Sequence, residues 1–67
     1  MSKISAEYKE IMEKEKQIIK RMDKKVVDAY ETEDFLVIVS ISENHIVWEH
    51  TFFKLNKKWD MNILSAN

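Results

Sequence analysis

Residues 35–42 read Phe-Leu-Val-Ile-Val-Ser-Ile-Ser, and this stretch decides the fold class of the chain. It is rich in β-branched and aromatic residues, which favour strands. Successive side chains of a strand point to opposite faces, so the odd-numbered positions share one face. They are Phe35, Val37, Val39 and Ile41. We expect that face to be buried.

Further strands surround this segment, because the sequence keeps a period of two and a β-branched or aromatic composition. We predict them at residues 26–32, 46–55 and 59–63, and the polar segments 33–34, 42–45 and 56–58 are predicted turns. The chain has no glycine, so residues that need a positive φ must be Asn or Asp. The candidates are Asp34, Asn44 and Asn56.

Residues 3–23 are predicted to form a helix, because apolar residues recur at intervals of three and four. They are Ile4, Tyr8, Ile11, Ile18 and Met22. Acidic residues near the start and basic residues near the end suit the helix dipole. We expect this apolar stripe to pack on the face that carries Val37 and Val39.

The chain is therefore predicted to be one small α+β domain over residues 1–67. Its architecture is an N-terminal amphipathic helix packed on a three- or four-stranded antiparallel meander (α-β-β-β-β). At 67 residues and 8.1 kDa it has room for one core. Cysteine is absent, which excludes disulfides and removes the commonest ligand of structural zinc. Domains of this size then depend on dense packing or self-association.

The charge balance excludes several function classes. The net charge is −1 and the pI about 6.1, whereas general polyanion binders usually carry a marked basic excess. No apolar run reaches the roughly 18 residues of a membrane span. The first residues lack the apolar segment of a signal peptide, and we expect a cytoplasmic protein. Phosphate-binding loops need glycine, so we expect no nucleotide cofactor, and we expect no metal.

An interaction surface is predicted because the sheet is apolar on both sides, whereas one helix covers one side. Leu36 and Ile38 lie opposite the odd-numbered set, and residues 46–55 carry large side chains on both faces. The interface candidates are Leu36, Ile38, Ile46, Trp48, His50, Phe52 and Trp59. We expect a homodimer, a foreign protein partner, or both. The alternative is a strongly curved sheet wrapped by the helix, with scattered apolar exposure.

The sequence offers no catalytic constellation. His45 and His50 stand near Glu43 and Glu49, but the two histidines fall on opposite faces of a strand and cannot grip one metal ion. Glu15 lies in the apolar seam of the helix, where it is either paired with a group such as His50, solvated, or a catalytic acid. We predict that the chain is not an enzyme.

The function predicted from these features is a non-catalytic interaction module: a regulator, inhibitor or accessory factor that docks through a sheet face or edge. We expect such a factor to belong to a bacterium or its phage. Separately, the excess of lysine over arginine is typical of an AT-rich genome. One alternative is a nucleic-acid-binding module that uses the basic helix end, which comprises Lys20, Arg21, Lys24 and Lys25. We expect no such binding, because stacking aromatics are not interleaved there. The other alternative is a half-barrel, an enzyme or ligand binder completed by dimerisation.

Overall fold

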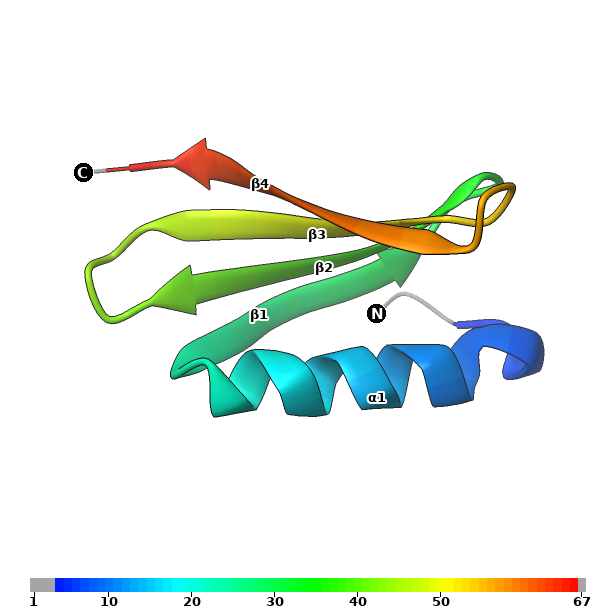
Figure 1. Ribbon diagram of the computed structural model, residues 1–67, viewed down its shortest axis with the longest axis horizontal. Helices are drawn as coiled ribbons and strands as arrows, with labels where there is room; N and C mark the ends of the chain where they lie inside the picture. The colour runs from blue at the N-terminus through cyan, green and yellow to red at the C-terminus, as the bar shows by residue number, and fades with distance from the viewer. Residues whose placement is uncertain (1–3, 67) are drawn as a thin grey trace.

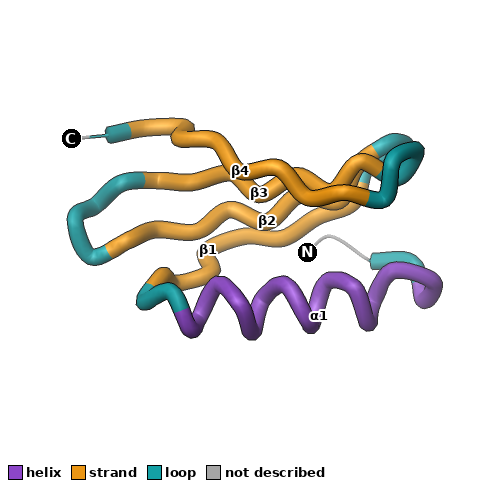
Figure 2. Tube along the Cα trace, in the orientation of Figure 1, coloured by secondary structure: helices purple, strands orange, loops and turns teal. Residues whose placement is uncertain are grey.

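The computed structural model describes residues 4–66 and contains one helix followed by a four-stranded antiparallel sheet (Figures 1 and 2). The elements are α1 (Ala6–Arg21), β1 (Lys24–Glu31), β2 (Phe35–Ser42), β3 (Val47–Phe53) and β4 (Lys58–Ser65). The strands lie side by side in the order β1-β2-β3-β4, each antiparallel to the next. The predicted α+β meander is confirmed, in its four-stranded form.

Three tight connections take a positive φ, and none is at a predicted position. The residues are Asp23, His45 and Lys57, with φ of 57°, 63° and 55°. Asp23 joins α1 to β1, while His45 and Lys57 each stand one residue beyond the predicted Asn. The hairpin register decides this, because Ser42 N–H donates to Ile46 and Lys57 N–H donates to Phe53. Backbone closure outweighs the local preference of Asn for the left-handed region.

The helix covers the even-numbered face of β2, so the predicted face is wrong. Leu36 and Ile38 are fully buried under α1, packed with Met12, Ile19 and Phe52. Cross-strand pairing explains the choice: Leu36 stands opposite Phe52 and Ile38 opposite His50, so the largest β3 side chains share this face. Ser40 is buried there too, and its hydroxyl is satisfied by a hydrogen bond to His50.

The odd-numbered face of β2 has no covering element among the described residues. Phe35, Val37, Val39 and Ile41 all lie on it, and Val37 is nevertheless buried by its neighbours. Phe35 packs edge-on against Phe53 across the strands, with ring centroids 5.3 Å apart. We call this side the open face. Its apolar residues shield one another, and this limits their contact with water.

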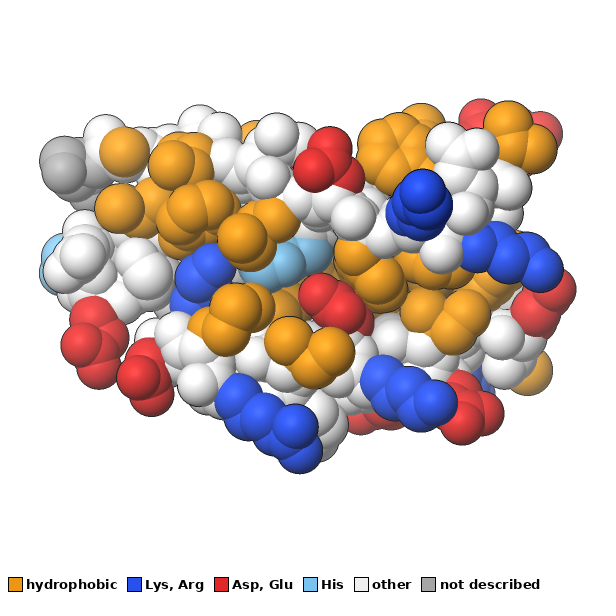
Figure 3. Space-filling view, in the orientation of Figure 1, with side chains coloured by type: hydrophobic (Ala, Val, Ile, Leu, Met, Phe, Trp, Pro, Cys, Tyr) orange, Lys and Arg blue, Asp and Glu red, His pale blue; other side chains and the backbone are white. Residues whose placement is uncertain are grey.

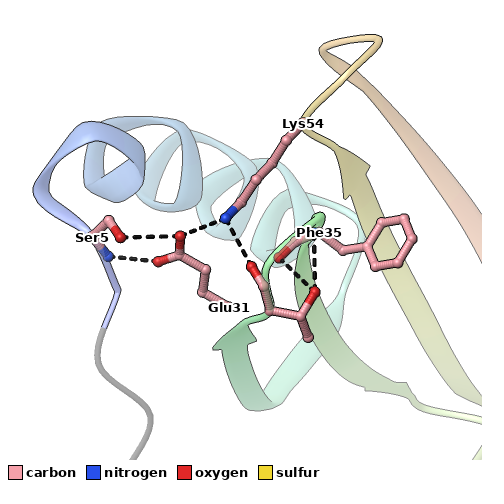
Figure 4. A network of polar contacts seen from close by, with 5 residues as sticks. Ser5, Glu31, Phe35 and Lys54 are labelled. Carbon is pink, nitrogen blue, oxygen red and sulfur yellow. Dashed lines mark hydrogen bonds and ion pairs between the residues drawn. The ribbon is translucent and has the colours of Figure 1, made fainter.

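A polar network ties the start of the helix to the sheet (Figure 4). The Glu31 carboxylate accepts the backbone N–H of Ser5 at 2.7 Å and its hydroxyl at 3.0 Å. Lys54 Nζ donates to the same carboxylate at 2.6 Å and to the Thr32 carbonyl at 2.8 Å. These charge-assisted bonds lower the pKa of Glu31 to about 2. Glu31 thus fixes the N-terminus of α1 against the end of β1.

The face assignment predicts a difference between two adjacent residues. Ile38→Ala removes a fully buried side chain and should cost about 2–5 kcal/mol, whereas Val39→Ala on the open face should cost clearly less. Urea unfolding followed by circular dichroism measures both. Where Ile38→Ala is too unstable to fold, Ile38→Val should still cost about 0.5–1.5 kcal/mol. Equal losses at the two positions would contradict the assignment.

The Glu31 network predicts a specific acid sensitivity. The pKa of this carboxyl is lower in the folded chain than in the unfolded one, so the unfolded state binds the proton first as the pH falls. The stabilisation is complete above about pH 4.5 and disappears as the pH approaches 2. Glu31→Gln should therefore lower stability at pH 7 and flatten its fall between pH 4.5 and pH 2. Glu33→Gln, a nearby exposed acid, is the control.

Candidate interaction surface

One helix does not cover the full width of the sheet face on which it packs. Strands in a sheet are about 4.8 Å apart, so four of them span roughly 19 Å, whereas a helix is about 10 Å wide. In the structure α1 runs beside β1 and β2, and β4 lies at the far edge of the sheet (Figures 1 and 2). His50 and Phe52 of β3 are buried on the helix side, but Met61 and Ile63 of β4 remain exposed there, so this part of β4 has room for a second layer.

A band of apolar side chains occupies this uncovered part of the sheet. Direct pairing places Trp48 opposite Ile63 and His50 opposite Met61, all on the helix side. Met61 is 43% exposed and Ile63 52%, and across from them Ile18 and Met22 of α1 are 46% and 42% exposed. We call the surface formed by Ile18, Met22, Trp48, Met61 and Ile63 the trough. Figure 3 shows hydrophobic side chains gathered in a band between the helix and the outer strand.

Lys24 crosses the floor of the trough. It starts on β1, and its Nζ lies 3.9 Å from the centroid of the Trp48 ring and 3.4 Å from Met61 Sδ on β4. Its aliphatic stem thus covers apolar surface that α1 does not reach. Burial lowers the pKa of Lys24. No carboxylate lies within ion-pair distance of its ammonium among residues 4–66.

Two further polar groups border the trough without an acceptor or an opposite charge. Glu15 on α1 is half-buried, and desolvation raises the pKa of its carboxyl. It forms no hydrogen bond or ion pair with another described residue. The Trp48 Nε1 atom is buried and has no hydrogen-bond partner in the described part of the chain. Such atoms are uncommon in folded proteins and call for an explanation.

His50 and Ser40 form a buried pair beneath the trough. Ser40 Oγ and His50 Nε2 are 2.8 Å apart, and both side chains are almost completely inaccessible. Desolvation, assisted by the nearby charge of Lys24, lowers the pKa of His50. The sequence analysis did not connect these residues, although the hairpin at 42–46 puts them on one face. Each member of the pair satisfies the hydrogen-bonding group of the other inside the core.

Four predicted interface residues are buried inside the chain and cannot form an outer surface. They are Leu36, Ile38, His50 and Phe52. Ile46, Trp48 and Trp59 are half-buried, and Trp48 lies in the trough. Ile18 and Met22 were predicted in the buried stripe of the helix, which is wrong, because Met12 and Ile19 occupy the core instead. Met61 and Ile63 were not predicted as surface residues. The sequence contained the pattern, because Trp59, Met61 and Ile63 alternate along one face of the strand. Using it requires knowing which face of the sheet the helix covers.

The two free edges of the sheet are protected against strand addition. Asp60 Oδ1 accepts the N–H of Met61 on β4, and Asp28 Oδ1 accepts the N–H of Ala29 on β1, both at 2.9 Å. The pairing register also shifts at Val26/Asp28 and at Val47/Trp48, which interrupts a regular ladder. Carboxylates and bulges are common devices that keep edge strands unpaired. The geometry therefore favours a face over an edge as the docking surface.

The predicted basic patch is divided in the structure. Lys20, Arg21 and Lys25 are exposed, but the Lys24 ammonium lies over Trp48 in the trough. Asp23 stands in the turn between them. A continuous row of cations that would follow a phosphate backbone is therefore not formed by these four residues.

Comparison with protein-family models, curated proteins and solved structures gave no match for this chain. Over residues 4–66, the helix is too short and too polar to cross a membrane. Nor do three His, Asp or Glu side chains of that range gather closely enough to hold a metal ion.

Burial of His50 predicts that stability decreases on mild acidification. The pKa of His50 is below 6.5 in the folded chain, so below about pH 6.5 the unfolded state takes up a proton that the folded state excludes. Stability should be fully present above pH 7 and fall towards pH 5.5. His50→Gln should reduce this slope, as measured by urea unfolding at fixed protein concentration. His45→Gln leaves His50 in place and should keep the slope.

Proposed function

We propose that this chain is a non-catalytic protein-interaction module, a small regulator or accessory factor, that acts as a homodimer formed through the trough. The single observation that supports it is the coincidence of exposed apolar residues from α1 and β4 on the uncovered part of the sheet. Contiguous apolar surface of this kind is typical of interaction sites. Each such side chain, when fully buried, contributes about 1.5–3 kcal/mol.

The trough is a better docking surface than the open face for two reasons. Its walls match in length: α1 is about 24 Å long and the eight residues of β4 extend about 26 Å. Its side chains are also more exposed, since most apolar residues of the open face are half-buried against one another. Four of the five trough residues are thus among the large apolar side chains that remain exposed in the monomer.

The non-catalytic part of the proposal is supported by the position of the reactive groups. Ser40 and His50 bond to each other below the surface, and Glu15 contacts neither of them. Lys24, the remaining candidate, has its ammonium against a thioether and an aromatic face. The exposed Ser5 hydroxyl does contact a carboxylate, that of Glu31, but this carboxylate is already engaged by Lys54 and by the Ser5 N–H. No exposed hydroxyl of residues 4–66 bonds to a histidine.

The proposal predicts a dimer that depends on the helix side of β4. Sedimentation equilibrium over a hundredfold concentration range should give a mass near 16 kDa, twice the 8.1 kDa of the chain. Ile63→Lys places a charge in the trough and should weaken association by at least about tenfold. The matched control is Asn62→Lys, because Asn62 is the next residue, is exposed, and pairs with Glu49 on the open face.

Two results would contradict the proposal. A mass near 8 kDa at every concentration would exclude self-association. An equal effect of Ile63→Lys and Asn62→Lys would place the dimer interface away from the trough.

A further inference from the structure

We propose that the Glu15 carboxylate of each chain pairs with the Lys24 ammonium of the other across a two-fold axis. This inference rests on the proposed dimer. It specifies which part of the second copy fills the trough and how the two copies are aligned. The occupant of the trough is the flank of the partner's α1 that carries Ile11, Glu15, Ile18 and Met22. These residues recur at intervals of four, three and four, so they form one stripe along the helix.

The chain itself shows how a lysine over an aromatic ring is normally compensated. Lys54 Nζ lies 4.8 Å from the Tyr8 ring centroid, and Glu31 accepts its hydrogen bond at 2.6 Å. Lys24 Nζ lies 3.9 Å from the Trp48 ring centroid, but its polar contact is the weakly accepting Met61 sulfur at 3.4 Å. Lys54 also donates to the Thr32 carbonyl, so the Lys24 ammonium lacks both the carboxylate and the carbonyl oxygen that Lys54 has among residues 4–66.

Glu15 is a carboxylate that lacks a cationic partner, whereas Lys24 is a cation that lacks a carboxylate. It stands between Ile11 and Ile18 on the helix flank, where burial disfavours its charge. Burying a charge is expensive unless an opposite charge accompanies it. Glu15 and Lys24 of one chain border the same trough but form no ion pair with each other. In the dimer, Glu15 of one chain and Lys24 of the other form the ion pair that neither group makes within its own chain.

A two-fold axis satisfies both groups at once. In an isologous interface residue i contacts j and j contacts i, so one axis generates two Glu15–Lys24 pairs. Ile18 lies between Glu15 and Met22 on the stripe, and an axis close to it brings the two helix flanks together antiparallel. The polar outer side of α1, which carries the exposed residues Glu13, Gln17 and Lys20, remains in water. Lys14 borders the stripe next to Ile18, and its ammonium pairs with Glu10 of its own chain.

Charge reversal tests this pairing directly. A homodimer of Glu15→Lys contains two cation–cation pairs and a homodimer of Lys24→Glu contains two carboxylate–carboxylate pairs, so each variant should self-associate at least about a hundredfold more weakly. An equimolar mixture restores both opposite-charge pairs and should form a heterodimer with close to the parent affinity. Because the two substitutions barely change the mass of the chain, one variant is labelled uniformly with ¹⁵N, and native mass spectrometry then distinguishes the heterodimer from either homodimer. Glu13→Lys, an exposed change on the same helix, replaces Glu15→Lys in the control mixture.

A cysteine probe gives a second measurement that does not depend on the charges or on the folding of Lys24→Glu. The chain contains no cysteine, so Ile18→Cys introduces one thiol per chain next to the expected axis. Mild oxidation should convert most of this variant to a covalent dimer. Gln17→Cys, on the exposed outer side, should remain largely monomeric under the same conditions.

The outcomes separate this inference from the proposed function. A parent dimer that Ile63→Lys weakens, together with failed heterodimer formation and no preferred cross-link at Ile18→Cys, would keep the trough interface and overturn the Glu15–Lys24 register. A monomeric parent chain would overturn both. Heterodimer formation, or selective cross-linking where Lys24→Glu does not fold, would support the pairing.

Discussion

A four-stranded sheet is about twice as wide as the single helix that covers it, and this mismatch determines most of the surface of the protein. The helix is held over β1 and β2 because Asp23 turns the chain directly from α1 into β1. The Glu31 network fixes the other end of the helix. With both ends anchored, α1 stays over β1 and β2, and Met61 and Ile63 on the helix side of β4 remain exposed.

Polar side chains with apolar stems or aromatic neighbours cover part of the apolar surface that the helix does not reach. Lys24 extends across the sheet from β1 and lies on Trp48, and His50 is satisfied from below by Ser40. Each group reduces the apolar area exposed to water, and each carries a desolvation cost. That cost falls on charged groups most strongly, which is why Lys24 and Glu15 both have pKa values shifted towards their neutral forms.

The elements could be predicted from the sequence because the hydrophobic period changes from 3.6 to 2 near Lys25. The covered face of β2 could not, since residues 35–39 are all apolar and Ser40 made the even-numbered set look exposed. The burial of Ser40 depends on its hydrogen bond with His50, ten residues away, and therefore on the register of the β2–β3 hairpin. The position of Lys24 depends on Trp48 and Met61 together, and therefore on the β3–β4 register as well.

Lys54 and Lys24 lie at the two ends of the same sheet face, and their difference connects stability to association. Lys54 pairs with the Glu31 carboxylate of its own chain, so the charge at this end of the domain is balanced without a second molecule. At the trough end, Lys24 and Glu15 form no ion pair with each other, and the surrounding apolar side chains are exposed. A domain with neither disulfide nor many core residues gains stability where such a surface is covered, because binding that favours the folded state also raises its apparent stability. Folding and association in this chain are therefore expected to depend on the same few residues.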